Sequence, residues 1–245
     1  MVSFLKIEVG DDLRVARGVI KRYECNRAEA SFVLTKNDQR VMQMSAIANA
    51  FAGMGGAATS QMSNASHIEE WADYLSFEIN DQRYQGWVWR SPFSEDDDVE
   101  VVYRMTSSIN EVIAIARPLD RLIALYPHCS RGVSAHWRAV SKAWFIWVFC
   151  LISFVIFSGL GMLLGFTKEL FLDIYNYIFL ACFILVFSAF TINMGFKLLP
   201  FASVAERVFA ALGWVNPSQI DLKKSSKEKK KEGDPGECGT FYFRY

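Results

Sequence analysis

Two long stretches in the second half of the chain contain no charged residue. They cover residues 143–167 and 174–196, which are 25 and 23 residues long. At about 1.5 Å per residue, a helix of either length crosses the roughly 30 Å hydrocarbon core of a bilayer. Both stretches are apolar on all sides, whereas a helix of a soluble bundle is apolar along one stripe. The pattern predicts transmembrane helices at 143–167 and 174–196, joined by the short turn 168–173.

Basic residues flank this predicted hairpin on both sides. They are Arg131, Arg138 and Lys142 before it, and Lys197 and Arg207 after it. The turn carries Lys168 alone. Because basic flanks stay on the cytoplasmic side, we expect a multi-pass protein of the bacterial inner membrane with a periplasmic turn and both termini in the cytoplasm. The first eight residues lack the apolar core of a signal peptide, so the first membrane helix is expected to direct insertion.

Residues 1–142 show the alternation of apolar and polar positions that is typical of strands. Residues 74–79 and 83–89 flank the turn pair Asn80-Asp81 and predict a hairpin. Further strands are expected at 99–103, 110–116 and 121–126, with 13–23 and 31–35 as partners. Short strands at this spacing favour a small antiparallel barrel or sandwich of the oligonucleotide-binding or SH3-like kind. The predicted fold class is therefore membrane α+β, a small antiparallel β-rich cytoplasmic module followed by a two-helix transmembrane hairpin.

A second uncharged segment, 41–66, interrupts the β-rich module. It is rich in Ala, Gly, Ser and Met, and Ala48, Ala52 and Gly56 recur at intervals of four residues. Such spacing lets a helix approach another closely, which is compatible with a third membrane helix or a re-entrant hairpin. The alternative is a loop inserted between two strands. Polar residues such as Gln43 and Asn49 oppose insertion and favour the loop, but both interpretations stay open.

Residues 197–245 follow the predicted hairpin. An apolar stripe at helical spacing predicts an amphipathic helix along the inner membrane interface; its residues are Phe201, Val204, Ala205, Val208, Phe209 and Leu212. A Lys-rich tail comes next, with Lys223, Lys224, Lys227, Lys229, Lys230 and Lys231. Near a membrane each such lysine contributes about 1 kcal/mol of attraction to anionic lipid. The alternative is a solvated tail that only enforces topology.

Small and polar residues inside the predicted spans are candidates for helix contacts. Gly161 and Gly165 form a motif that allows close packing and self-association of membrane helices. The candidates for a polar membrane face are Asn176, Ser188, Thr191 and Asn193. Asn176 and Asn193 lie 17 positions apart, which places them on nearly the same side of a helix.

Charge and composition exclude several classes of function. Lys plus Arg equal Asp plus Glu at 26 each, so nucleic acid is not an expected partner. The five cysteines follow no regular spacing, which argues against a disulfide framework. His128, Cys129 and His136 supply three metal donors where a tetrahedral site needs four. We therefore expect no catalytic, cofactor-binding or metal-binding residues, and no enzyme.

Two segments carry a family resemblance. Residues 116–132 read ARPLDRLIALYPHCSRG before the predicted hairpin, and residues 234–237 read DPGE, followed by GTFYFRY at 239–245. In these segments the chain resembles a family of bacterial inner-membrane proteins labelled type VI secretion system effectors. The resemblance implies a membrane-active component of interbacterial competition, either an ion-leak effector or the immunity protein that neutralises one. It supplies no catalytic residues.

The expected function is thus a non-enzymatic role at the membrane. The alternative, from the residues alone, is a membrane-anchored binding module whose cytoplasmic β domain recruits a protein or a small ligand. The expected partners are the lipid bilayer, a second copy of the chain through the membrane helices, and a type VI secretion component or a cognate toxin or immunity protein.

Overall fold

The computed structural model describes residues 13–30, 32, 70–106, 109–163 and 174–245. In these ranges the chain forms an α+β fold with eight strands and three α-helices. The strands are β1 (Leu13–Val19), β2 (Lys21–Ala30), β3 (Glu70–Ile79), β4 (Gln82–Val88), β5 (Asp98–Thr106), β6 (Ile109–Arg117), β7 (Leu122–Leu125) and β8 (Tyr242–Arg244). The helices are α3 (Val133–Leu163), α4 (Ile174–Ala211) and α5 (Leu222–Glu228), and a short 3-10 turn, η1, covers Pro217–Gln219.

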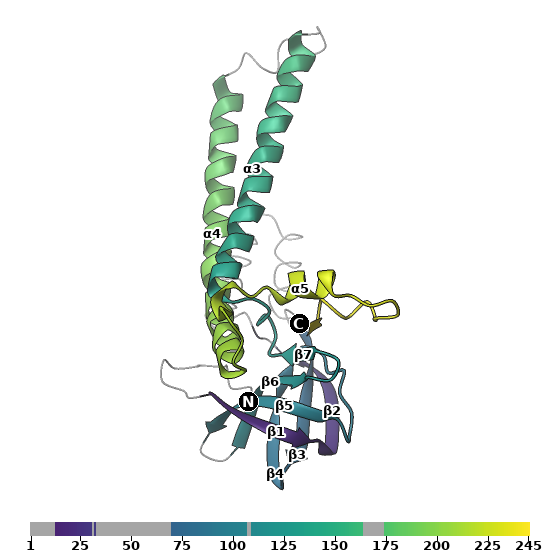
Figure 1. Ribbon diagram of the computed structural model, residues 1–245. Coiled ribbons are helices and arrows are strands. Elements are labelled where there is room, and N and C mark those ends of the chain that lie inside the picture. Colours follow the sequence, from purple (N-terminus) through teal and green to yellow (C-terminus); the bar gives the residue numbers. More distant parts are fainter. Residues whose placement is uncertain (1–12, 31, 33–69, 107–108, 164–173) are drawn as a thin grey trace.

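Figure 1 shows the sheet at one end of the molecule and the helices α3 and α4 extending away from it. Helix α5 and the end of α4 lie close to the sheet. We call the sheet, α5 and residues 201–211 of α4 the β body. The segment 41–66 and the turn 168–173 lie outside the described residues, so the predictions made for them stay predictions.

All eight strands belong to one mixed sheet with the order β1-β5-β6-β4-β3-β2, and β7 and β8 continue from β6. The predicted hairpin is confirmed, because β3 pairs with β4 in antiparallel fashion around Asn80 and Asp81. Both turn residues have a positive φ, 51° and 60°, which suits a tight hairpin turn. The expected strand at 13–23 is in fact two strands that part at the buried Ile20.

The prediction of a purely antiparallel module is wrong in one place, because β4 and β6 run parallel. Gly86 of β4 lies opposite Val112 of β6, and a side chain at Gly86 would place its Cβ 2.4 Å from the Val112 carbonyl oxygen. No residue with a Cβ fits at that distance without displacing the backbone. The glycine therefore permits the close approach that the parallel pair needs.

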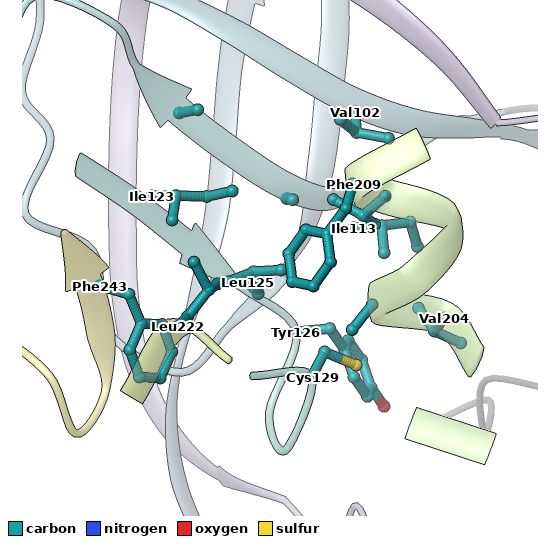
Figure 2. Packing of buried hydrophobic residues seen from close by; sticks show 14 of the residues in the cluster. Val102, Ile113, Ile123, Leu125, Tyr126, Cys129, Val204, Phe209, Leu222 and Phe243 are labelled. Carbon is teal, nitrogen blue, oxygen red and sulfur yellow. The ribbon is translucent and has the colours of Figure 1, made fainter. Parts of the chain in front are cut away.

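Two clusters of buried side chains fill the β body. One cluster comprises residues such as Leu75, Phe77 and Ile115 together with Tyr242 of β8. The other joins the sheet to the helices: Val204, Ala205, Val208 and Phe209 of α4 and Leu222 of α5 are its helical members. Figure 2 shows Phe209 directed towards Ile113 and Leu125 of the sheet.

This second cluster corrects the interpretation of the apolar stripe at 201–212. We expected a separate helix lying on lipid, but the stripe is the end of α4, which continues through Pro200. Val208 and Phe209 are completely buried against the sheet. Amphipathic spacing indicates that one side of a helix faces an apolar surface. That surface can be a membrane or, as here, the side chains of a sheet.

The Lys-rich tail is also folded in part. After α5 the chain returns to the sheet, where β8 pairs with β7 in antiparallel register. Phe243 is 1% exposed and packs in the cluster that contains Leu222. Arg244 is buried as well, and its guanidinium lies 2.7 Å from the Asp234 carboxylate and donates to the Asp120 carbonyl. The β-rich module therefore does not end at residue 142, because its last strand follows the helices.

Helices α3 and α4 lie side by side and antiparallel. Three contacts show this direction: His136 with Gly195, Trp144 with Ser188, and Trp147 with Phe187. Residue numbers rise along α3 as they fall along α4. Large apolar side chains along both helices remain exposed, including Phe149 at 70% and Val186 at 70%. Among the described residues one stretch, Ala181–Ala211 of α4, is long and apolar enough to cross a membrane.

Candidate functional site at the neck

A small cavity lies where the two long helices meet the β body. Its volume is about 80 Å³. Three parts of the chain line it: the segment around β4 and β7, the beginning of α3 with the middle of α4, and helix α5. The lining residues are Trp89, His128, Ser130, Arg131, His136, Leu198, Ala202 and Lys223. We call this region the neck and the space inside it the neck cavity.

The neck is held together by a short antiparallel bridge between the segments that precede α3 and follow α4. The Leu222 amide donates to the Ser130 carbonyl at 3.0 Å, and the Gly132 amide donates to the Ile220 carbonyl at 2.9 Å. A Cβ at Gly132 would lie 2.3 Å from the Pro217 carbonyl oxygen, so only glycine fits there. The two chain segments are thus fixed to each other by backbone contacts.

An ion pair reinforces the bridge. Nε of Arg131 donates to the Asp221 carboxylate at 2.8 Å. The other carboxylate oxygen of Asp221 accepts from the Lys224 amide at 3.2 Å and caps the N-terminus of α5. The first amide of α3, at Val133, donates to Glu206 of α4. At the N-terminus of α3 and of α5, a backbone amide therefore donates a hydrogen bond to a carboxylate.

The two histidines of the neck have different partners. His128 Nε2 lies 2.8 Å from the carboxylate of Glu70, at the start of β3. His136 is buried, and its Nε2 lies 2.9 Å from the Gly195 carbonyl oxygen of α4. Because a carbonyl oxygen only accepts, His136 Nε2 is the donor of this contact, which links α3 to α4.

Lys223 is the cation that projects from α5 towards the cavity. Its side chain is half-buried, and Nζ lies 5.9 Å from the centre of the Trp89 ring. Burial lowers the pKa of the Lys223 ammonium and the nearby positive charge of Arg131 lowers it further, while the Asp221 carboxylate acts in the opposite direction. None of the ion pairs between described residues includes Lys223.

The other lysines proposed for lipid contact lie outside the cavity. Lys224 is 74% exposed and lies 3.8 Å from Glu228 on the same helix. Lys227, Lys229, Lys230 and Lys231 are exposed. Their contact with lipid stays a prediction, and the structure separates them from Lys223, which sequence reasoning had grouped with them.

Three of the polar residues proposed for the membrane helices, Ser188, Thr191 and Asn193, have described side chains. Ser188 Oγ accepts from Trp144 Nε1 at 2.8 Å and so faces α3. The Thr191 hydroxyl donates to the Phe187 carbonyl of its own helix, and Asn193 is exposed. The side chain of Asn176, the surroundings of Gly161, and Gly165 lie outside the description.

The described close approach of α3 and α4 is at a different glycine. A Cβ at Gly195 would lie 3.2 Å from the Trp137 ring and 3.3 Å from Val140. The sequence signal for this contact was the isolated Gly195 near the end of the second apolar stretch, opposite the Trp-rich start of the first. Helix packing was predicted from the spacing of Gly161 and Gly165 and missed this position.

The site offers binding groups. Cys129 is fully buried in the core beneath the neck, where burial raises the pKa of its thiol. Within the described part of the chain, no three His, Cys, Asp or Glu side chains are grouped closely enough to hold a metal ion. Sequence reasoning placed His128 and His136 in a polar region above the first helix, but Glu70, Trp89 and Asp221 come from distant segments without a recognisable motif.

Comparison with protein-family models, with curated proteins and with solved structures found no match.

Proposed function

We propose that the protein is a non-enzymatic, two-pass membrane anchor that holds the β body on the cytoplasmic face of a membrane as a binding module. One observation carries the proposal. Strand β7 precedes the long helices and β8 follows them, yet the two strands are hydrogen-bonded neighbours. The chain must therefore leave the β body and return to the same side, so the number of membrane crossings between them is even.

The surfaces of the helices support a lipid environment. By residue count α3 and α4 are roughly 45 and 55 Å long, so each extends well past the β body. Among the described side chains away from the sheet, some contact the other helix and many others are exposed, as at Phe145 and Phe190. An exposed apolar surface of this extent is stable in lipid and unfavourable in water. If α4 crosses at 181–200, an even count requires a second crossing within 143–167.

The charge distribution supports the orientation. Arg138 and Lys142 lie in the first ten residues of α3, and Lys197 of α4 is next to Leu198, which lines the neck cavity. Basic residues next to a span remain in the cytoplasm. The β body and the described residues after α4 are accordingly cytoplasmic in this proposal.

The polar residues of α4 favour an anchor over a pore. Ser188 and Asn193 point in directions about 140° apart on a helix of 100° per residue. Ser188 accepts a hydrogen bond from Trp144, and Thr191 donates one to a carbonyl of its own helix. A conducting path needs several polar groups on one face, whereas the Trp144–Ser188 contact joins the two helices and supports an anchor.

Cysteine labelling tests the anchor and its orientation. The probe is a membrane-impermeant maleimide, applied to intact cells and to inverted membrane vesicles. A variant that keeps only Cys25, which is exposed on β2, should react in the vesicles and not in the cells. A variant with Leu170→Cys as its only cysteine should react in the opposite way. A variant that keeps only the buried Cys129 controls for unfolding and should react in neither.

Labelling of Cys25 in intact cells would overturn the orientation. Labelling of the Leu170→Cys variant from the same side as Cys25 would overturn the two crossings. The role in interbacterial competition, implied by the family resemblance, is tested separately by expressing the protein alone in a naive bacterium. An anchor should leave growth and membrane potential unchanged, whereas depolarisation that is lost in an Asn176→Leu, Asn193→Leu double variant would support a pore.

A further inference from the structure

We propose that the neck cavity binds a phosphate group. The polar groups that line it are the guanidinium of Arg131, the ammonium of Lys223, the imidazoles of His128 and His136, and the Ser130 hydroxyl. Nε of Arg131 and Nε2 of each histidine already contact protein oxygens, so Lys223 and the remaining donors of Arg131 and Ser130 are the groups left for a ligand. The lining groups come from the segment before α3, from α3 itself and from α5. Donors that converge from several elements on one small space are typical of a binding site for an oxyanion.

Arg131 and Lys223 are the two side chains of the cavity wall with a fixed positive charge, and among the described residues only Arg131 has an ion-pair partner. Arg131 is balanced by Asp221, and His128 faces Glu70. Glu206 is occupied by the Val133 amide at the start of α3. Lys223 has no such partner among the described residues, although it is half-buried and lies near Arg131. An anion in the cavity would offset the repulsion between these two cations and supply the missing partner.

The size of the cavity narrows the ligand to a single small group. A volume of about 80 Å³ corresponds to two or three water molecules at about 30 Å³ each. A phosphate group fits such a space. Trp89 and Ala202 form apolar parts of the wall, so a bound oxyanion would be partly shielded from water and its hydrogen bonds strengthened.

The phosphate group could belong to a lipid or to a soluble compound. The cavity lies at the end of the apolar helices, where the phosphate of a phospholipid headgroup would be at hand. A soluble phosphate compound presents the same oxygen atoms. The binding itself does not depend on whether α3 and α4 cross a membrane, so its failure and a failure of the proposed anchor are separate results.

The experiment uses the full chain in a maltoside detergent and phosphate-free buffer. Inorganic phosphate is titrated by calorimetry at constant ionic strength. In a second arm, the micelles contain phosphatidic acid, or a diacylglycerol with the same acyl chains and no phosphate. The parent is compared with Lys223→Gln, with Lys223→Arg, which keeps the charge, and with Lys224→Gln, which removes the same charge from the exposed neighbour.

We expect Lys223→Gln to weaken binding about tenfold or more, the loss expected for one charge-assisted hydrogen bond. Lys224→Gln and Lys223→Arg should bind within about a factor of three of the parent. Binding of inorganic phosphate as well as phosphatidic acid would identify soluble phosphates as ligands, and binding of phosphatidic acid alone would identify the lipid headgroup. Either result supports the cavity as the site.

Thermal unfolding without phosphate provides the check on folding. Because Lys223→Gln removes a half-buried charge beside Arg131, its Tm should equal or exceed that of the parent, while the rise in Tm on adding the ligand is lost. The proposal is overturned if neither phosphate nor phosphatidic acid binds. It is equally overturned if Lys223→Gln and Lys224→Gln weaken binding to the same extent, because that result indicates general surface charge.

Discussion

Arg131 and Asp221 lie 90 positions apart in the chain, and their side chains meet at 2.8 Å. The first residue lies two positions before α3, and the second lies two positions after the η1 turn that follows α4. Their contact lies beside the neck cavity and joins the two points where the long helices enter and leave the β body. The pair thus closes the base of the helical hairpin.

Reversing one charge of this pair should destabilise the protein, and reversing both should recover part of the loss. Arg131→Glu places two carboxylates together at a part-buried position, and we expect a loss of about 1–3 kcal/mol. The Arg131→Glu, Asp221→Arg double variant restores opposite charges. Denaturant unfolding of the four proteins in detergent gives the coupling energy. A double variant no more stable than the sum of the single changes would mean that the pair contributes nothing.

Truncating Phe243 should affect the β body as strongly as a change in the middle of the sheet. Its side chain is 1% exposed and fills the space between β7 and α5, so Phe243→Ala should cost about 3–5 kcal/mol. Leu119→Ala is the control, because Leu119 is 94% exposed and should change stability by less than about 0.5 kcal/mol. Equal, small effects of the two changes in thermal unfolding would show that β8 does not complete the sheet.

Gly86 should not tolerate even a methyl group. In Gly86→Ala the new Cβ would meet the Val112 backbone and force β4 and β6 apart, with an expected loss of about 1–3 kcal/mol. Gly236→Ala is the matched control, because nothing lies within 4 Å of its added Cβ. Thermal unfolding of both variants measures the difference, and a Gly86→Ala protein as stable as Gly236→Ala would contradict the close parallel pairing.

The Arg244–Asp234 pair should make the stability of the folded protein depend on pH in the acidic range. The hydrogen bond from Arg244 lowers the pKa of the Asp234 carboxyl below its unfolded value. A lowered pKa stabilises the folded state above about pH 4, and this contribution is lost as the pH falls through the folded pKa. Asp234→Asn should therefore lower Tm at pH 7, and its difference from the parent should shrink below about pH 4. The exposed Asp81→Asn change should show no such narrowing.

The elements that depend on local pattern could be predicted from the sequence. The hairpin at 74–89 follows from alternation on both sides of Asn80-Asp81, and its two strands are neighbours in the sheet. The uncharged stretches likewise predict long helices, whatever surrounds them. Sequence reasoning ended α4 too early, because Lys197 and Pro200 are ordinary signals for a helix end. The structure continues the helix through both residues, since the sheet covers the following turns.

The features that depend on distant partners could not be predicted. A run of three residues, Tyr242–Arg244, has no strand signal of its own and becomes a strand because β7 offers a free edge. Lys223 and Lys224 are neighbours of identical type, yet one faces the neck cavity and the other faces solvent. Only the placement of α5 against Trp89 and Arg131 distinguishes them, and no spacing in the sequence contains that information.

The pairing of β7 with β8 also fixes an order of events in biosynthesis. Strand β8 is synthesised after both long helices, and Arg244 must find a carbonyl 124 positions earlier in the chain. Until then β7 has an open edge, and apolar residues such as Ile123 lack their cover. Unpaired strand edges attract chaperones, proteases and other unfolded chains. Completion of the sheet is thus a late step, and a chain whose helices fail to fold back would keep this edge open to pairing with other chains.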